Sequence, residues 1–323
     1  WAEVPITIVT SSKSLQFRIC RRPSICRLDK SQDVLKMVIL LIYIGKLGYI
    51  SCMQKIEFIK MHGLGNDFVI IDQRSKEIPI TEYVIKKISN RRTGAGCDQL
   101  ITISNSKNSV DAEMKIYNPG GDRAEACGNG TRCVARILFD EDKNRETLRI
   151  HSDAGILEAK KEDDNISVNM GYITSDWKKI PLSKEMDTMN IPISIQGYSK
   201  GIAVNVGNPH VIFFGKSINK TNLNEIGPTI EEHEFFPNKT NVELVEIINK
   251  NTLKMRVWER GVGITLACGS GACASVYAAW KKNFTNSNVE VILEKGSLFI
   301  NIIDNKAIMT GPTEISYYGN IEI

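Results

Sequence analysis

The sequence predicts an α+β fold of two pseudo-symmetric domains, each a strand-rich, barrel-like sheet wrapped around a central helix. Three observations lead to this prediction. The cysteine turn at 126–130 has a near-copy 141 residues later, at 267–271. Two further landmarks, which begin at Gly65 and Gln99, recur at an offset of 142. A repeat of this length is too long for a solenoid, so it indicates two related domains that face one another.

Composition limits the class of protein. The chain has 323 residues, of which 42% are hydrophobic and 24% charged, as expected of a globular protein with room for two cores. The net charge is only +4 and the basic residues are scattered, which argues against a nucleic-acid partner. Eight cysteines in a chain of this size suit reduced intracellular thiols better than a disulfide framework, so we expect a cytoplasmic protein.

The first 52 residues differ from the rest. They begin with Trp1, contain a basic cluster at 18–27 and include an apolar run, 37–44, that is too short to span a bilayer. We therefore expect no membrane association. The simplest interpretation is sequence upstream of a true start at Met53, and a transit peptide is the alternative.

The globular pattern divides into two predicted domains. Residues 1–52 are expected to form an extension outside the fold. Residues 53–170 form the first domain and 171–312 the second, with the junction in a polar stretch that contains two prolines. A last strand at 313–323 is expected to return to the first domain.

The first domain alternates strand and turn patterns around two helices. Thr81 is expected to cap a helix that ends at Ser89, and a second helix follows Cys127. Alternating apolar residues predict its strands, at 56–61, 68–72, 100–103, 111–118, 147–151, 155–159 and 166–170. The second domain repeats this order, and its own helix follows Cys268.

Each of these two cysteines lies on a turn of small residues ahead of an apolar helical pattern. A thiol at a helix N-terminus is expected to have a lowered pKa, because free N–H groups and the helix dipole favour the thiolate. The same N–H groups can bind a carboxylate. Asn129 and Ser270 are residue types that can cap the first turn.

Two such thiols on opposite sides of a ligand could carry out a two-base racemisation. One thiolate removes a proton from carbon, and the other cysteine, as a thiol, returns a proton to the opposite face. His210 and Glu259 are candidates to tune the thiols. No P-loop or pyridoxal phosphate lysine is evident, so we expect no cofactor, and a carboxylate held by the helix N-termini favours an α-amino acid as substrate.

Six ordered motifs resemble the diaminopimelate epimerase family from Met53 to the C-terminus. They begin at Met61, Gly94, Ala126, Gly207, Trp258 and Ala267. The resemblance implies cofactor-independent interconversion of LL- and meso-diaminopimelate, on the route to lysine and peptidoglycan. It also implies a fold of two pseudo-symmetric domains, a small-molecule substrate and a homodimer.

Carried over by motif, the resemblance makes Cys127 and Cys268 the acid/base pair, with His210 and Glu259 in support. Arg260 is suited to clamp a carboxylate. The substrate contacts that the resemblance implies are Asn66, Gln99, Asn118, Gly128, Asn129, Asn208, Asn241, Glu259, Arg260, Gly269 and Ser270. No metal is expected, since the spacings of Cys127, Cys133, Cys268 and Cys273 fit a zinc site poorly.

One loop departs from the family pattern, which has an acidic residue, glycine and serine beginning two residues after Asn118. This chain has Gly120, Gly121 and Asp122 there, followed by Arg123. The change puts the shape and charge of the loop in doubt but leaves the spacing to Cys127 intact.

Two rival functions remain open. A proline or hydroxyproline racemase usually carries a histidine where this chain has Asn129, which disfavours that substrate class. The paired thiols could instead form a redox switch in a small-molecule binding protein. Turnover under reducing conditions would separate an enzyme from such a switch.

Overall fold

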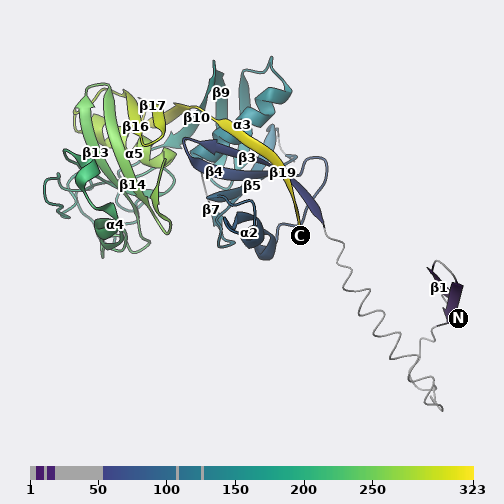
Figure 1. Ribbon diagram of the computed structural model, residues 1–323. Helices are drawn as coiled ribbons and strands as arrows, with labels where there is room; N and C mark the ends of the chain where they lie inside the picture. Colours follow the sequence, from purple (N-terminus) through teal and green to yellow (C-terminus); the bar gives the residue numbers. More distant parts are fainter. Residues whose placement is uncertain (1–4, 11–12, 19–53, 107–108, 125–126) are drawn as a thin grey trace, which may run out of the picture. The chain divides into compact units, whose positions relative to one another are not determined.

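The computed structural model describes residues 5–10, 13–18, 54–106, 109–124 and 127–323 (Figure 1). The chain divides into two compact units, 1–53 and 54–323. In the first unit, β1 (Pro5–Thr10) and β2 (Lys13–Arg18) form an antiparallel hairpin. The apolar run at 37–44 and Met53 lie outside the described residues.

The second unit carries the predicted duplication. Its first half contains β3 (Lys55–Gly63), β4 (Asn66–Asp72), α2 (Glu82–Ser89), β5 (Gln99–Ser104), β6 (Ala112–Tyr117), β7 (Arg123–Ala124), α3 (Gly128–Glu141), β8 (Thr147–Ser152), β9 (Gly155–Glu162) and β10 (Asn165–Tyr172). Its second half contains β11 (Ile202–Asn205), β12 (Pro209–Phe214), η1 (Ile218–Lys220), α4 (Leu223–Glu231), β13 (Asn241–Asn249), β14 (Thr252–Glu259), β15 (Gly263–Thr265), α5 (Gly269–Lys281), β16 (Asn288–Leu293), β17 (Gly296–Ile303), β18 (Lys306–Gly311) and β19 (Glu314–Glu322).

The two halves repeat the same strand register. Strands β4 and β5 run parallel and pair Phe68 with Gln99, while β12 and β13 run parallel and pair His210 with Asn241. In each pair the second-half residue lies 142 positions after its first-half counterpart. The predicted α+β fold of two related strand-rich domains is thereby confirmed.

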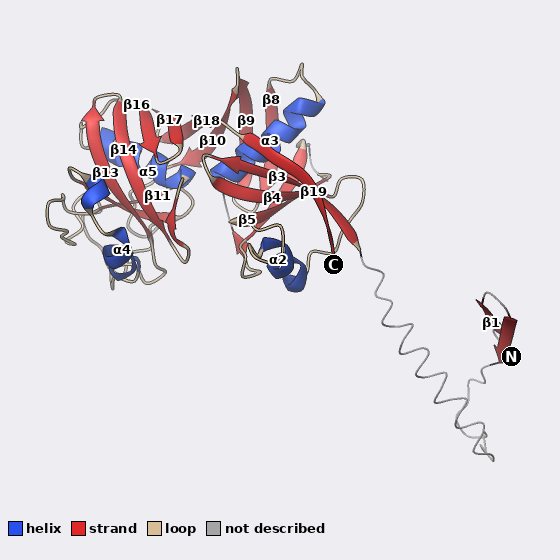
Figure 2. Cartoon of the chain, in the orientation of Figure 1, coloured by secondary structure: helices blue, strands red, loops and turns tan. Residues whose placement is uncertain are grey.

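Each half encloses one helix, as Figure 2 shows for α3 and α5. The inward residues of α3 are those that its apolar spacing indicates, and Val134, Ile137 and Leu138 are buried. Helix α5 is buried along most of its length. Full burial of each such large side chain stabilises the folded state by about 1.5–3 kcal/mol. Packing in the core therefore holds both helices, and with them their N-termini, in place.

The halves are joined by strand pairing. Strands β10 and β18 pair antiparallel, with Val168 opposite Met309, and β19 pairs antiparallel with β3 of the first half.

The predicted cap of α2 is also present, since the Thr81 hydroxyl accepts a hydrogen bond from the Val84 N–H. Within the described ranges, no helix is both long enough and apolar enough to cross a membrane.

Candidate active site

Cys127 and Cys268 are themselves the N-cap residues of α3 and α5. Both have extended backbones, and each sulfur accepts a hydrogen bond from an N–H three residues on, Gly130 or Gly271, at 3.4 Å. The expectation that Asn129 and Ser270 would cap the helices is therefore wrong. Because each cysteine already fills the capping position, these two residues fall within the first turn.

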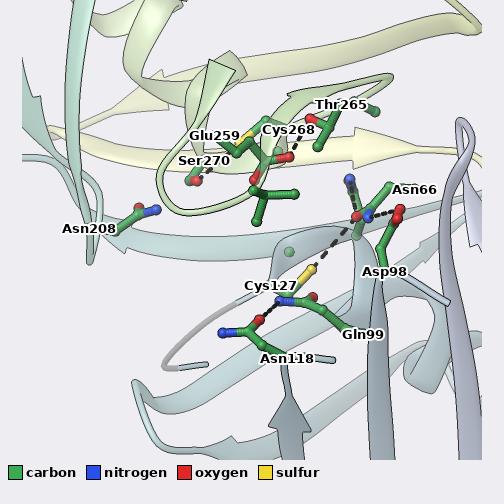
Figure 3. Close-up of a pocket in the computed structure, with 15 residues that line it drawn as sticks. Asn66, Asp98, Gln99, Asn118, Cys127, Asn208, Glu259, Thr265, Cys268 and Ser270 are labelled. Atoms are coloured by element: carbon green, nitrogen blue, oxygen red, sulfur yellow. Dashed lines mark hydrogen bonds between the residues drawn. The ribbon is translucent and has the colours of Figure 1, made fainter. Parts of the chain in front are cut away.

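Both cysteines line one pocket between the two halves (Figure 3). The pocket collects most of the side chains and glycines that the sequence predicted to contact substrate. These are Asn66, Gln99, Asn118, Gly128, Asn129, Asn208, Glu259, Gly269 and Ser270. Many of them occupy equivalent positions in the two halves, so the pocket has an approximate twofold arrangement.

On the first-half side, Asn66 links Cys127 to a carboxylate. Its Oδ1 accepts hydrogen bonds from Asn129 Nδ2 at 3.1 Å and from the Cys127 thiol at 3.9 Å. Its Nδ2 donates to Asp98 Oδ2 at 2.9 Å. Since a carboxylate accepts only, Asp98 fixes which end of the Asn66 amide faces the thiol.

The atypical loop after Asn118 folds back onto that residue. Gln99 Nε2 donates to Asn118 Oδ1 at 3.1 Å, and Asn118 Nδ2 donates to Asp122 Oδ2 at 2.7 Å. Asp122, within the loop that departs from the family pattern, therefore orients the Asn118 amide through its carboxylate.

On the second-half side, Glu259 lies beside Cys268. The Thr265 hydroxyl donates a hydrogen bond to Glu259 Oε1, and the Cys268 thiol interacts with the same carboxyl group. Burial raises the pKa of Glu259, and these interactions only partly offset the rise. Cys268 Sγ is also 3.5 Å from Ser270 Oγ.

The thiols are less acidic than their helix positions suggested. Burial raises the pKa of Cys127 to about 12, although the Gly130 N–H opposes the rise. Burial also raises the pKa of Cys268 well above its ordinary value, and the nearby carboxyl groups of Glu259 and Glu243 raise it further. The expected lowering is wrong because desolvation of the thiolate outweighs the helix N-terminus.

Two predicted contacts belong to an adjoining pocket. Asn241 and Arg260 line it together with Arg91 and Arg123. The Asn241 amide is already bonded to backbone, because its Nδ2 donates to the Pro209 carbonyl at 2.8 Å and its Oδ1 accepts from the Arg260 N–H at 2.9 Å. Asn241 therefore braces the segment that presents the Arg260 guanidinium.

His210 does not line either pocket. It is fully buried, and its Nδ1 lies 2.6 Å from Glu243 Oε1 while its Nε2 lies 2.9 Å from Asn208 Oδ1. His210 thus reaches the pocket through Asn208.

Sequence reasoning missed Asp98, Thr265 and Glu243. Asp98 directly precedes Gln99 in the motif that begins at Gly94, so its place in that motif could have identified it. Glu243 lies two residues after Asn241, so strand alternation puts both on one face of an otherwise apolar segment. Thr265, in the short strand β15, gave no comparable signal.

In this fold, a pair of cysteines over one pocket indicates the class of amino-acid epimerases and racemases. Within that class, the model of the family described as diaminopimelate epimerase matches residues 58–175 and 202–316. The chain belongs to this family.

Curated relatives agree with the family assignment. The chain is 40% identical over 266 residues to a diaminopimelate epimerase of Zymomonas mobilis, a match that covers 82% of the chain and 97% of the relative. It is 43% identical over 275 residues to that of Pelagibacter ubique, with 83% and 98% covered.

Solved structures agree with the fold. A phenazine biosynthesis protein of the PhzF family from Enterococcus faecalis has a TM-score of 0.62 at 15% identity and covers 84% of this chain and all of its own. A hydroxyproline epimerase from Agrobacterium vitis has a TM-score of 0.60 at 11% identity, with 83% and 91% covered.

Proposed function

We propose that this protein interconverts LL- and meso-diaminopimelate without a cofactor, for lysine and peptidoglycan biosynthesis. The observation that carries the proposal is the pair of cysteines at equivalent helix N-caps, both lining one pocket. Asn129, where a proline racemase usually has histidine, favours diaminopimelate over proline substrates. Turnover under reducing conditions would separate this reaction from the alternative, a redox switch in a small-molecule binding protein.

In the proposed reaction, one thiolate takes the α-proton, so that the Cα–H bond breaks and an S–H bond forms. The opposite thiol then gives up its proton to the other face of the carbon, and its S–H bond electrons stay on sulfur. The stereocentre is inverted, and the two cysteines exchange protonation states. The reverse reaction uses the same steps in the opposite order.

The negative charge that develops on the substrate would be stabilised by the two helices. The first-turn N–H groups of an α-helix have no partner within the helix, and a carboxylate can accept from them. Gly128, Asn129, Gly269 and Ser270 supply these groups from opposite sides of the pocket. Such donors are worth more in a buried site than in water.

The raised pKa favours the proton-donating form of the pair. Burial raises the pKa of Cys127 to about 12, so in the empty pocket it is held as the thiol, the form that returns a proton to carbon. The Glu259 carboxyl group interacts with Cys268, so in its ionised form it can take the thiol proton and generate the thiolate. This is the supporting role that we propose for Glu259.

The adjoining pocket would hold the distal end of the substrate, which carries a second carboxylate and a second ammonium group. Arg260 is the proposed carboxylate clamp, with Arg91 and Arg123 contributing positive charge. Asp122 and Glu259 line the same pocket and suit the ammonium group.

We further propose the domain division 53–170 with 313–323, and 171–312. A homodimer is also proposed, because strand β19, which pairs with β3, exposes Tyr317 and Tyr318, which are 46% and 70% accessible. Sedimentation velocity would test the dimer.

Since the mechanism requires reduced thiols, we propose a cytoplasmic location.

The test of function is proton exchange at the α-carbon. The reduced protein is incubated with LL-diaminopimelate in deuterium oxide beside Cys127→Ala and Cys268→Ala. Deuterium at the α-position together with the meso isomer, both lost in either variant, supports the two-base epimerase. If the reduced wild-type protein gives neither exchange nor inversion, the proposal is wrong, and proline substrates are tested next.

A further inference from the structure

The proposed mechanism gives no role to the buried pair formed by His210 and Glu243. Both side chains have no solvent exposure, and their Nδ1 and Oε1 atoms are 2.6 Å apart. Glu243 Oε2 is buried and has no hydrogen-bond partner among the described residues. Burying an acid and an imidazole in a core is costly, so their presence calls for an explanation.

The fold itself does not require this pair. In the first half, Phe68 and Ile101 occupy the same places in the equivalent parallel strands, and both are fully buried. Helix α3 packs above them as α5 packs above His210 and Glu243: a Cβ on Gly130 would meet Ile101, and one on Gly271 would meet Glu243. An apolar pair therefore suffices to build this layer of the core.

The hydrogen bonds of His210 fix its protonation at one nitrogen. Asn208 presents Oδ1, an acceptor, to Nε2 at 2.9 Å, so Nε2 must carry a proton. Nδ1 then either donates to an ionised Glu243 or accepts from a protonated one. In both cases the pair holds two protons and is neutral overall, which suits a site without water.

This arrangement sets the direction of the Asn208 amide. With Oδ1 held by the imidazole, Nδ2 is turned toward the pocket that Asn208 lines (Figure 3). An N–H donor there can bind a carboxylate of the substrate. The equivalent residue of the first half, Asn66, is fixed by a carboxylate as well, because Asp98 accepts directly from its Nδ2.

We propose that Glu243 is a positioning residue: acting through His210, it holds Asn208 with its amide N–H group toward the substrate. The proposal rests on the proposed function for its kinetic consequence, but its structural claim can be tested in the free protein. An ionised Glu243 beside a neutral Nδ1–H imidazole would leave Nε2 bare and turn the Asn208 amide around. Loss of Glu243 would remove the partner that prevents this.

The first measurement is long-range ¹H–¹⁵N NMR of the four histidines in the free protein, with His210 assigned by His210→Gln. We expect a protonated Nε2 at His210 in the wild-type protein. In Glu243→Met, the His210 signals should shift toward a mixture of tautomers. A bare Nε2 in the wild-type protein would overturn the proposal, whatever the enzyme's substrate proves to be.

The second measurement is a double-mutant cycle with LL-diaminopimelate. Glu243→Met should raise KM about tenfold with a smaller change in kcat, whereas Glu243→Gln, which can still hydrogen-bond Nδ1, should retain most of the affinity. In an Asn208→Ala background, Glu243→Met should add little, because the two residues act as one unit. Equal effects in both backgrounds, or an unchanged KM, would refute the proposal.

Glu246→Met is the matched control, because Glu246 lies on the same strand, is only partly buried and is absent from both pockets. It should leave kcat and KM as in the wild type. Thermal unfolding of every variant separates a kinetic effect from a loss of fold. If the wild-type protein lacks epimerase activity but shows a protonated Nε2, the proposed function fails and the positioning of Asn208 stands.

Discussion

The two halves of this protein share a fold but differ beneath their cysteines. Under Cys127 the equivalent strands carry Phe68 and Ile101, and under Cys268 they carry His210 and Glu243. In the helices it is the first half that carries the charged group. Helix α3 contains the fully buried Arg132, and the corresponding residue of α5 is Cys273. Repeated backbone geometry thus holds two thiols alike, while the buried charges around them make the thiols different.

The largest expected effect tests what the halves have in common. Replacing Cys127 or Cys268 by alanine should each lower kcat for epimerisation by about 10³-fold, because each removes one of the two acid/base groups. Steady-state kinetics in both directions would measure this. A variant that retains near wild-type inversion would show that its half supplies no proton-transfer group.

Glu259→Gln sharpens the comparison, since the equivalent first-half residue is the neutral Asn118. We expect about a 10²-fold loss of kcat/KM. Because burial and the Glu259 carboxyl group raise the pKa of Cys268, removing that carboxyl should lower this pKa. The pH profile of Cys268 alkylation, measured in Cys127→Ala, should therefore move to lower pH. A shift to higher pH would contradict the assignment.

Arg132→Met removes the buried charge that is peculiar to the first half. Arg132 Nε and Nη2 have no hydrogen-bond partner among the described residues, so its loss should raise the melting temperature. The guanidinium also opposes the burial that raises the pKa of Cys127, so alkylation of Cys127 at a fixed pH should slow by about tenfold. Unchanged reactivity would mean that Arg132 has no electrostatic influence on the thiol.

The smallest effect concerns a charged network that the second half lacks, where Pro209 replaces Asp67. Burial works against ionisation of Asp67, but hydrogen bonds from Arg91 and Lys60 lower its pKa to about 2. A depressed pKa stabilises the folded state above the unfolded pKa, and the gain is lost as pH falls toward 2. Asp67→Asn should cost about 1–2 kcal/mol at pH 6 and little near pH 2, as urea unfolding at both values would show.

The sequence predicted those parts of the site that follow from local patterns. The repeated cysteine turns predicted where both helices begin, and the motifs predicted most of the residues that line the pocket. The thiol pKa values could not be predicted, because they depend on how completely Cys127 and Cys268 are buried by distant strands. The burial of His210 and its contact with Glu243 were missed for a similar reason: they require the register of β12 against β13, which no single segment encodes.

The pairing of β10 with β18 places Val168 directly opposite Met309, its own counterpart 141 residues later. Equivalent residues that face each other across an antiparallel ladder are the signature of a two-fold axis, as in a homodimer interface. Here both sides belong to one chain, so the site forms in a first-order process that does not depend on protein concentration. Covalent linkage also frees each half to change without its partner, which an identical pair of subunits could never do.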